Sequence, residues 1–154
     1  MITDKNQFFS INELMPLIIE TISAGNSIRF SVTGNSMFPL FANRRDSVTV
    51  SAAEDIKKYD IVLHKRADGT YIMHRVIKVS GDVLTIAGDN EIEKEKNVPK
   101  DAVIAKVTSF TRKGKDYTMN EMWYKLYSRI WLAVFPARFI ILDFLIAVRR
   151  IVSR

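Results

Sequence analysis

The sequence predicts a mainly β domain, with a short helix before it and amphipathic helices after it. Between residues 27 and 112, apolar and polar residues alternate in short runs that are separated by turn-forming residues. Residues 10–24 and 119–152 instead repeat their apolar residues at helical spacing. Many short strands joined by close turns are typical of an antiparallel sheet.

Residues 10–24 are expected to form a helix that covers one side of this sheet. Ser10 and Glu13 have the spacing of a capping box, although a proline inside the run makes Asn12 an alternative cap. Gly25 is a natural stop. The residues that form the apolar face are Ile11, Leu14, Met15, Ile18 and Ile22.

Six strands are expected after this helix. Residues 66–69 and 80–82 carry turn signals between two pairs of them. Residues 91–100 are highly charged and are expected to form a loop. The expected strands are 27–32, 47–51, 60–64, 71–79, 83–87 and 102–112.

Composition divides the 154 residues into a helical segment (1–25), a β domain (26–113) and a C-terminal helical segment (114–154). The chain has no cysteine, which excludes a disulfide scaffold, a thiolate zinc site and a cysteine nucleophile. All the net charge of +6 falls in residues 112–154, which hold nine Lys/Arg against three Asp/Glu. Because these basic residues flank a very apolar run, an anionic membrane is a better partner than nucleic acid.

The C-terminal segment reads as two amphipathic helices, the second of which begins near Pro136. Sixteen of the 19 residues from 130 to 148 are apolar, enough for a single membrane span. Arg138 and Asp143 would each cost roughly 2.5–3.5 kcal/mol inside a bilayer, so residues 119–154 are expected to lie on an anionic membrane surface. Packing on the β domain, or a dimer seam, is the alternative.

A serine lies in a constrained turn directly after the first strand. Gly34 can adopt backbone angles that a side chain forbids, and Pro39 restrains the exit of the turn. The turn therefore holds the Ser36 hydroxyl still, as a nucleophile requires, although a serine in a turn is more often a simple turn residue.

A serine nucleophile needs a base, and the chain has only two histidines. His74 lies on an apolar strand face, where a histidine is more often a packed residue than a base. His64 lies at a strand end and is the weaker candidate. Asp89 follows a glycine at another strand end and could support an imidazole, or could simply bond its own backbone in an Asx turn.

Together these residues form a pattern that resembles signal peptidase I and its relatives. The order and spacing agree over residues 28–107, with Tyr59 and Ala105 in place of two glycines of the family pattern. The histidine resembles that of the endoplasmic-reticulum and archaeal branch, where it replaces the bacterial lysine. The matching segments are Gly34-Asn-Ser-Met-Phe-Pro39, Tyr59-Asp-Ile-Val-Leu63, Met73-His-Arg-Val76, Gly88-Asp-Asn90 and Ile104-Ala-Lys-Val107.

The resemblance implies a coiled β fold and a serine endopeptidase that cuts a peptide or protein precursor. It makes Ser36 the nucleophile, His74 the general base and Asp89 the residue that supports His74. It places Met37 and Phe38 along the substrate cleft, and it implies no cofactor and no metal.

The N-terminal part of the sequence differs from the family. The first apolar run contains two glutamates and does not read as the family's N-terminal anchor, which suggests an enzyme bound peripherally on the cytoplasmic side of a membrane. The competing hypothesis is a non-catalytic membrane-surface or partner-binding module of the same fold. A self-cleaving repressor-type peptidase is a further alternative, because Ala24-Gly25 matches its cleavage dipeptide.

Overall fold

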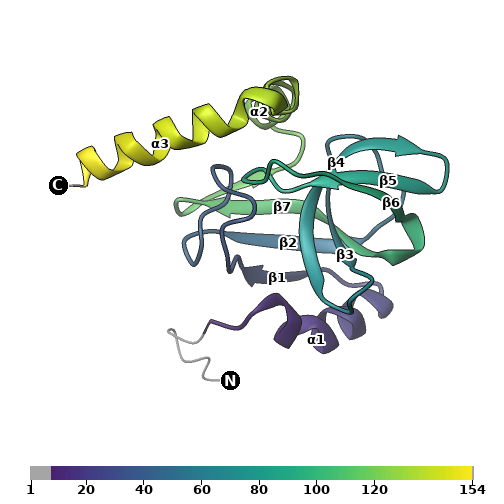
Figure 1. Ribbon diagram of the computed structural model, residues 1–154. Coiled ribbons are helices and arrows are strands. Elements are labelled where there is room, and N and C mark those ends of the chain that lie inside the picture. The colour runs from purple at the N-terminus through teal and green to yellow at the C-terminus, as the bar shows by residue number, and fades with distance from the viewer. Residues whose placement is uncertain (1–7, 154) are drawn as a thin grey trace.

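A computed structural model describes residues 8–153 (Figure 1). It confirms a mainly antiparallel β fold, with eight strands, an N-terminal helix and C-terminal helices. The elements are α1 (Ile11–Ser23), β1 (Ile28–Ser31), β2 (Ser47–Ala52), β3 (Ile61–Lys65), β4 (Tyr71–Ser80), β5 (Val83–Ala87), β6 (Glu95–Pro99), η1 (Lys100–Ala102), β7 (Val103–Arg112), β8 (Lys115–Thr118), α2 (Met122–Ala133), η2 (Phe135–Ala137) and α3 (Arg138–Val152). The first seven residues of the expected N-terminal segment, and Arg154, lie outside the described part.

Strand β7 pairs with three other strands of the sheet. The strand order is β1-β2-β7-β3-β4-β5-β6, and β8 also pairs with β7. The first half of β7 lies between β2 and β3, while its second half lies between β2 and β8. Strands β1 and β6 end this path, so the Ser36 turn leaves from an edge strand.

The capping box at Ser10 is present and starts α1 as predicted. The Ser10 Oγ accepts from the Glu13 N–H at 3.3 Å, and the Glu13 carboxylate accepts from the Ser10 N–H at 2.6 Å. Ala24 caps the other end, and Gly25 follows with φ of +80°. Residues 24 and 25 therefore form the end of a helix in this fold.

Two apolar clusters fill the domain because side chains alternate across each strand. Ile61, Leu63 and Met73 belong to the main cluster with α1, β1, β2 and β7. Val62 and Val76 point to the other face, where they join a smaller cluster with residues of β5 and β6. His64 is two residues after Val62 in β3, and His74 is two residues before Val76 in β4. Both histidines therefore lie on the sheet face that carries the smaller cluster.

Two parts of the β domain differ from the prediction. Residues 95–99, expected in a loop, form the edge strand β6, and the sheet continues past residue 113 into β8. In β6 only Val98 is buried, and its charged neighbours are tolerated because an edge strand keeps one side in solvent. The sequence of β6 therefore lacks the alternation of apolar and polar residues by which a strand is predicted.

The C-terminal helices lie on the side of the molecule opposite α1 (Figure 1). Helix α2 buries Tyr124, Ser128 and Trp131, whereas α3 buries only Arg138 and Leu142 and extends past the sheet. Within residues 8–153 no single helix has the length and apolarity to cross a membrane; α2 together with 135–152 reaches both, but the two are bent by 74°.

Candidate functional site

The Ser36 turn is held by its own backbone and by Asn43. Gly34 has φ of +90°, which favours glycine, and its N–H donates to Asn43 Oδ1 at 3.0 Å. The Phe38 N–H closes the turn on the Asn35 carbonyl at 3.1 Å. Ser36 itself is half-buried. The turn therefore presents the serine from a fixed backbone, as the sequence predicts.

The segment Gly88-Asp-Asn90 packs directly against this turn. The Asn90 N–H donates to the Ser36 carbonyl at 2.9 Å. A Cβ at position 88 would lie 2.5 Å from the same carbonyl oxygen, closer than real Cβ atoms approach backbone. Gly88 is thus required by close approach, and two of the predicted motifs meet at Ser36.

A cavity of about 190 Å³ adjoins Ser36. Its walls are mostly apolar and come from α1, from β1 with the turn that follows, and from the start of β4. Met37 lines it and is also part of the main core, whereas Phe38 is not among its lining residues. The residues that line the cavity are Ile11, Phe30, Ser31, Val32, Thr33, Ser36, Met37, Tyr71, Ile72 and Met73.

His74 is completely buried in β4, and among the described residues neither ring nitrogen has a hydrogen-bond partner. Its Nε2 lies 3.3 Å from Glu91 Oε1, within ion-pair distance but outside hydrogen-bond geometry. Its Nδ1 lies 3.8 Å from Glu95 Oε1. His74 is therefore not a packed histidine with both nitrogens satisfied, because each nitrogen faces a carboxylate that it does not bond.

Glu91 connects His74 to the Ser36 turn. Its side-chain carbons lie 3.1–3.2 Å from the position of a Cβ on Gly88, the residue that touches the Ser36 carbonyl. The imidazole of His74 lowers the pKa of Glu91, and burial partly opposes this shift. The structure thus places Ser36, Gly88, Glu91 and His74 in one continuous set of contacts.

His64 lies beside His74, with ring centroids 6.1 Å apart. It is also buried, and neither of its ring nitrogens has a hydrogen-bond partner in residues 8–153. Burial lowers the pKa of His64 to about 4, against the attraction of Glu95, so this imidazole is neutral at pH 7. The sequence made His64 the weaker candidate, whereas the structure places it next to the stronger one.

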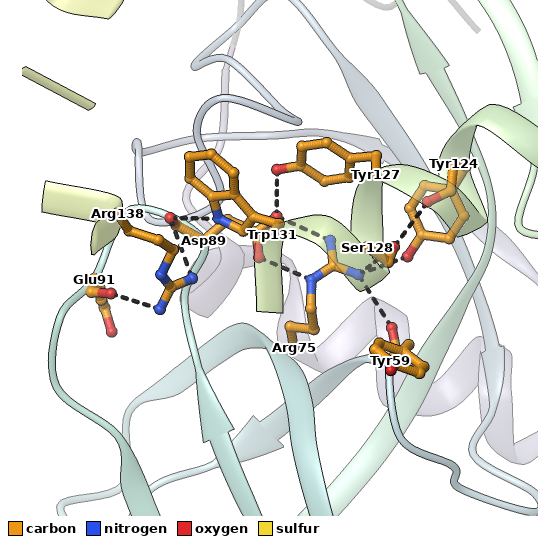
Figure 2. Close-up of polar contacts among 9 residues, drawn as sticks. All are labelled: Tyr59, Arg75, Asp89, Glu91, Tyr124, Tyr127, Ser128, Trp131 and Arg138. Atoms are coloured by element: carbon orange, nitrogen blue, oxygen red, sulfur yellow. Dashed lines mark hydrogen bonds and ion pairs between the residues drawn. The ribbon is translucent and has the colours of Figure 1, made fainter. Parts of the chain in front are cut away.

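Asp89 makes no hydrogen bond or ion pair with His74. Its carboxylate accepts two hydrogen bonds from Arg75, at 2.8 and 2.9 Å, and one from the Tyr127 hydroxyl at 2.8 Å (Figure 2). Both charged side chains are fully buried. The direct support of His74 by Asp89 that the resemblance implies is therefore absent, since both carboxylate oxygens are occupied elsewhere.

The Arg75–Asp89 pair joins the β domain to α2. Arg75 Nη1 also donates to the Tyr124 hydroxyl and to Ser128 Oγ, both at 2.9 Å, and Trp131 Nε1 donates to the Asp89 carbonyl at 3.0 Å (Figure 2). Burial alone would lower the pKa of Arg75, but the Asp89 carboxylate outweighs it and raises that pKa. This ion pair and its partners, here named the Arg75–Asp89 hub, hold α2 in place.

The start of α3 is tied to the same segment. Arg138 is buried and donates from Nη2 to the Glu91 carbonyl at 2.8 Å (Figure 2). Burial lowers its pKa to about 10, against the attraction of Asp89. Residues 89–91 are therefore bound from both C-terminal helices.

Arg75, Glu91 and Glu95 were not among the site residues predicted from the sequence. Arg75 follows His74 directly in the sequence, and tyrosine, serine and tryptophan recur on one face of α2. This pattern could have indicated a buried charge that bonds to polar side chains of the helix. No such pattern marks Glu91 and Glu95, because they belong to a charged run that resembles a solvated loop.

Comparison with known proteins adds no assignment at this point. No family model matches the chain, and no curated protein matches its sequence. The function of the site must therefore be inferred from its geometry.

Proposed function

We propose that this protein is a serine endopeptidase in which Ser36 is the nucleophile and His74 the general base. The observation that carries the proposal is the contact between the Ser36 turn and Gly88, with Glu91 connecting that contact to His74 Nε2. A turn-held serine beside a small cavity, connected through Gly88 and Glu91 to a buried imidazole, is an arrangement suited to acyl transfer.

In the proposed reaction, the Ser36 oxygen bonds to the carbonyl carbon of the scissile peptide while its proton passes to His74 Nε2. The imidazolium gives that proton to the departing amine as the C–N bond breaks, which leaves an acyl group on Ser36. A water molecule then loses a proton to His74 as its oxygen bonds to the acyl carbon. The bond from that carbon to the Ser36 oxygen breaks, and His74 returns the proton to Ser36. Glu91 is half-exposed, so its side chain can turn toward solvent and clear Nε2.

The oxyanion of each tetrahedral intermediate needs hydrogen-bond donors. Within residues 8–153, the Ser36 N–H donates no hydrogen bond. It is therefore available to donate to the oxygen of the attacked carbonyl. The apolar cavity of about 190 Å³ beside Ser36 has room for small side chains of an extended peptide. The proposed substrate is therefore a peptide or precursor with small residues next to the cut.

We further propose that α3 brings this site to an anionic membrane surface. Phe139, Ile140 and Phe144 are more than half exposed, and Arg149 and Arg150 follow at the end of the helix. Exposed aliphatic and aromatic side chains with arginines are suited to a lipid interface. Because α2 is bound to the β domain, α3 is the part of residues 119–154 assigned to lipid.

A peptide library tests the peptidase proposal. The full-length protein is incubated with random peptides in the presence of anionic vesicles, and new termini are identified by mass spectrometry. Wild type and Ser80→Ala should produce the same cuts, because Ser80 is exposed and does not line this cavity. Ser36→Ala should produce none. Equal cutting by Ser36→Ala, or none by folded wild type, would contradict the proposal.

A further inference from the structure

Three potential metal ligands converge on the face of the sheet that carries the smaller apolar cluster. His64, His74 and Glu95 offer two imidazole nitrogens and a carboxylate oxygen that all lie within 4.8 Å of one another. They come from β3, β4 and β6, three separate strands whose register fixes their positions. A cavity of about 490 Å³ is lined by His64 and Glu95 and reaches solvent through the segments at 65–68 and 96–99.

Both imidazoles are buried without hydrogen bonds, which is costly. His64 is 1% and His74 0% exposed, and all four of their ring nitrogens are without a partner in residues 8–153. A buried polar group without a hydrogen bond costs about 1–3 kcal/mol, so native proteins leave few of them. Two adjacent cases beside one carboxylate indicate that a ligand satisfies them together.

We propose that His64, His74 and Glu95 bind one divalent transition-metal ion, with Zn²⁺ as the best match. Two imidazoles and one carboxylate are a donor set that zinc accepts, and they leave a fourth position open toward the cavity. With bonds of about 2.1 Å, the ligand atoms must close to about 3.4 Å from one another. Glu95 lies on an edge strand and is partly exposed, so its side chain can make this movement.

Charged side chains beside the three ligands can hold them in place. Arg66 donates from both Nε and Nη2 to Glu95 Oε1. The other carboxylate oxygen, Oε2, accepts no hydrogen bond from Arg66. On His74, Nδ1 faces Glu95 while Nε2 faces Glu91 at 3.3 Å. A metal-bound histidine commonly donates its other N–H to a carboxylate, which here assigns Nδ1 to the metal and Nε2–H to Glu91.

Such an ion would compete with the proposed chemistry. A His74 that binds metal through Nδ1 and carries a proton on Nε2 cannot accept the Ser36 proton. Zinc is thus expected to inhibit the peptidase reversibly, and this consequence alone rests on the proposed function. Metal binding itself depends only on the three ligands.

The test uses the tag-free, full-length protein and Zn²⁺, followed by calorimetry and by ¹⁵N NMR of the imidazoles. Because the chain has two histidines, both can be followed separately. One equivalent of Zn²⁺ should shift both rings and mark Nδ1 of His74 as the bound atom. His64→Gln and Glu95→Gln should weaken binding by more than about 100-fold, beyond the 10–100-fold typical of outer-shell residues.

Glu93→Gln is the matched control, since it removes the same charge from an exposed neighbour in the same segment. It should bind Zn²⁺ as wild type does. Undiminished binding by folded His64→Gln and Glu95→Gln, or no binding by wild type, would overturn the metal site and leave water as the partner of these nitrogens. Circular dichroism establishes that each variant is folded.

Inhibition has a separate readout. The rate at which a fluorophosphonate labels Ser36 is compared with and without Zn²⁺ in each protein. Zinc should slow labelling at least tenfold in wild type and have no effect in His64→Gln. Zinc binding without slower labelling would overturn the inhibition and keep the site, whereas a wild type that never labels would contradict the peptidase proposal and leave the binding data standing.

Discussion

Gly88 has the most demanding backbone position at the site. Of the six glycines, it is the one whose missing side chain makes room for another backbone, the Ser36 carbonyl. The other five have positive φ and open space around the position of a Cβ. The sequence made Gly88 part of a motif, and the structure gives the steric reason.

Gly88→Ala should therefore separate the 88–90 segment from the Ser36 turn. The added methyl would lie 2.5 Å from a backbone oxygen, so the cost of overpacking, about 1–3 kcal/mol, should appear in the free energy of unfolding. Labelling of Ser36 should slow as well, because the turn moves relative to His74. Denaturant unfolding and labelling of the folded variant check both results, and wild-type values for both would contradict this account of Gly88.

At the scale of elements, α2 is fixed by a charge pair that the helix does not itself contain. Arg75 and Asp89 belong to β4 and to the turn after β5, and α2 supplies Tyr124, Tyr127 and Ser128 as their hydrogen-bond partners. Removing one member of a buried pair leaves the other charge uncompensated.

Asp89→Asn should lower the free energy of unfolding by about 3–5 kcal/mol, because Arg75 stays charged and buried. Tyr127→Phe removes one hydrogen bond from the same carboxylate and should cost about 1–3 kcal/mol. Asp101→Asn, an exposed change of equal charge, should stay within about 0.5 kcal/mol of wild type. Urea unfolding measures all three, and an Asp89→Asn midpoint equal to that of Asp101→Asn would refute the structural role of the hub.

Local patterns predicted most of the fold, and long-range contacts account for what they missed. The capping box at Ser10 and the turn at Gly34 lie within a few residues of their partners, so the sequence shows them. The partners of Asp89 lie 14 and 38 residues away, and Glu95 reaches the histidines only through the pairing of Ile86 with Glu95. Such contacts depend on strand register, which a single sequence does not specify.

On the scale of the whole molecule, the fold separates a bound helix from an exposed one. Helix α2 belongs to the β domain through the hub, so deleting all of residues 119–154 would also remove four partners of Arg75 and Asp89. Helix α3 can be removed after Arg138, which leaves the hub intact. This boundary makes the proposed membrane contact testable without unfolding the domain.

A chain that ends at Arg138 should keep the unfolding midpoint of wild type and lose binding to anionic vesicles. Arg149→Gln with Arg150→Gln should weaken binding by about 2 kcal/mol, at about 1 kcal/mol for each basic residue, and added salt should shrink the difference. Lys113→Gln with Lys115→Gln makes the same change of charge on the β7–β8 turn and should have little effect. Sedimentation with vesicles measures the binding of each protein. Full binding by the truncated chain would exclude α3 as the membrane contact.

The reaction with a fluorophosphonate shows whether Ser36 is a nucleophile activated by His74. The adduct site is found by mass spectrometry of digested protein, and labelling rates are compared between wild type, Ser80→Ala and His74→Gln. We predict a single adduct on Ser36, a wild-type rate in Ser80→Ala, and a rate about 10²–10⁴-fold lower in His74→Gln, as loss of a general base entails. A folded wild type that does not react, or equal rates in wild type and His74→Gln, would contradict the assignment of Ser36 and His74.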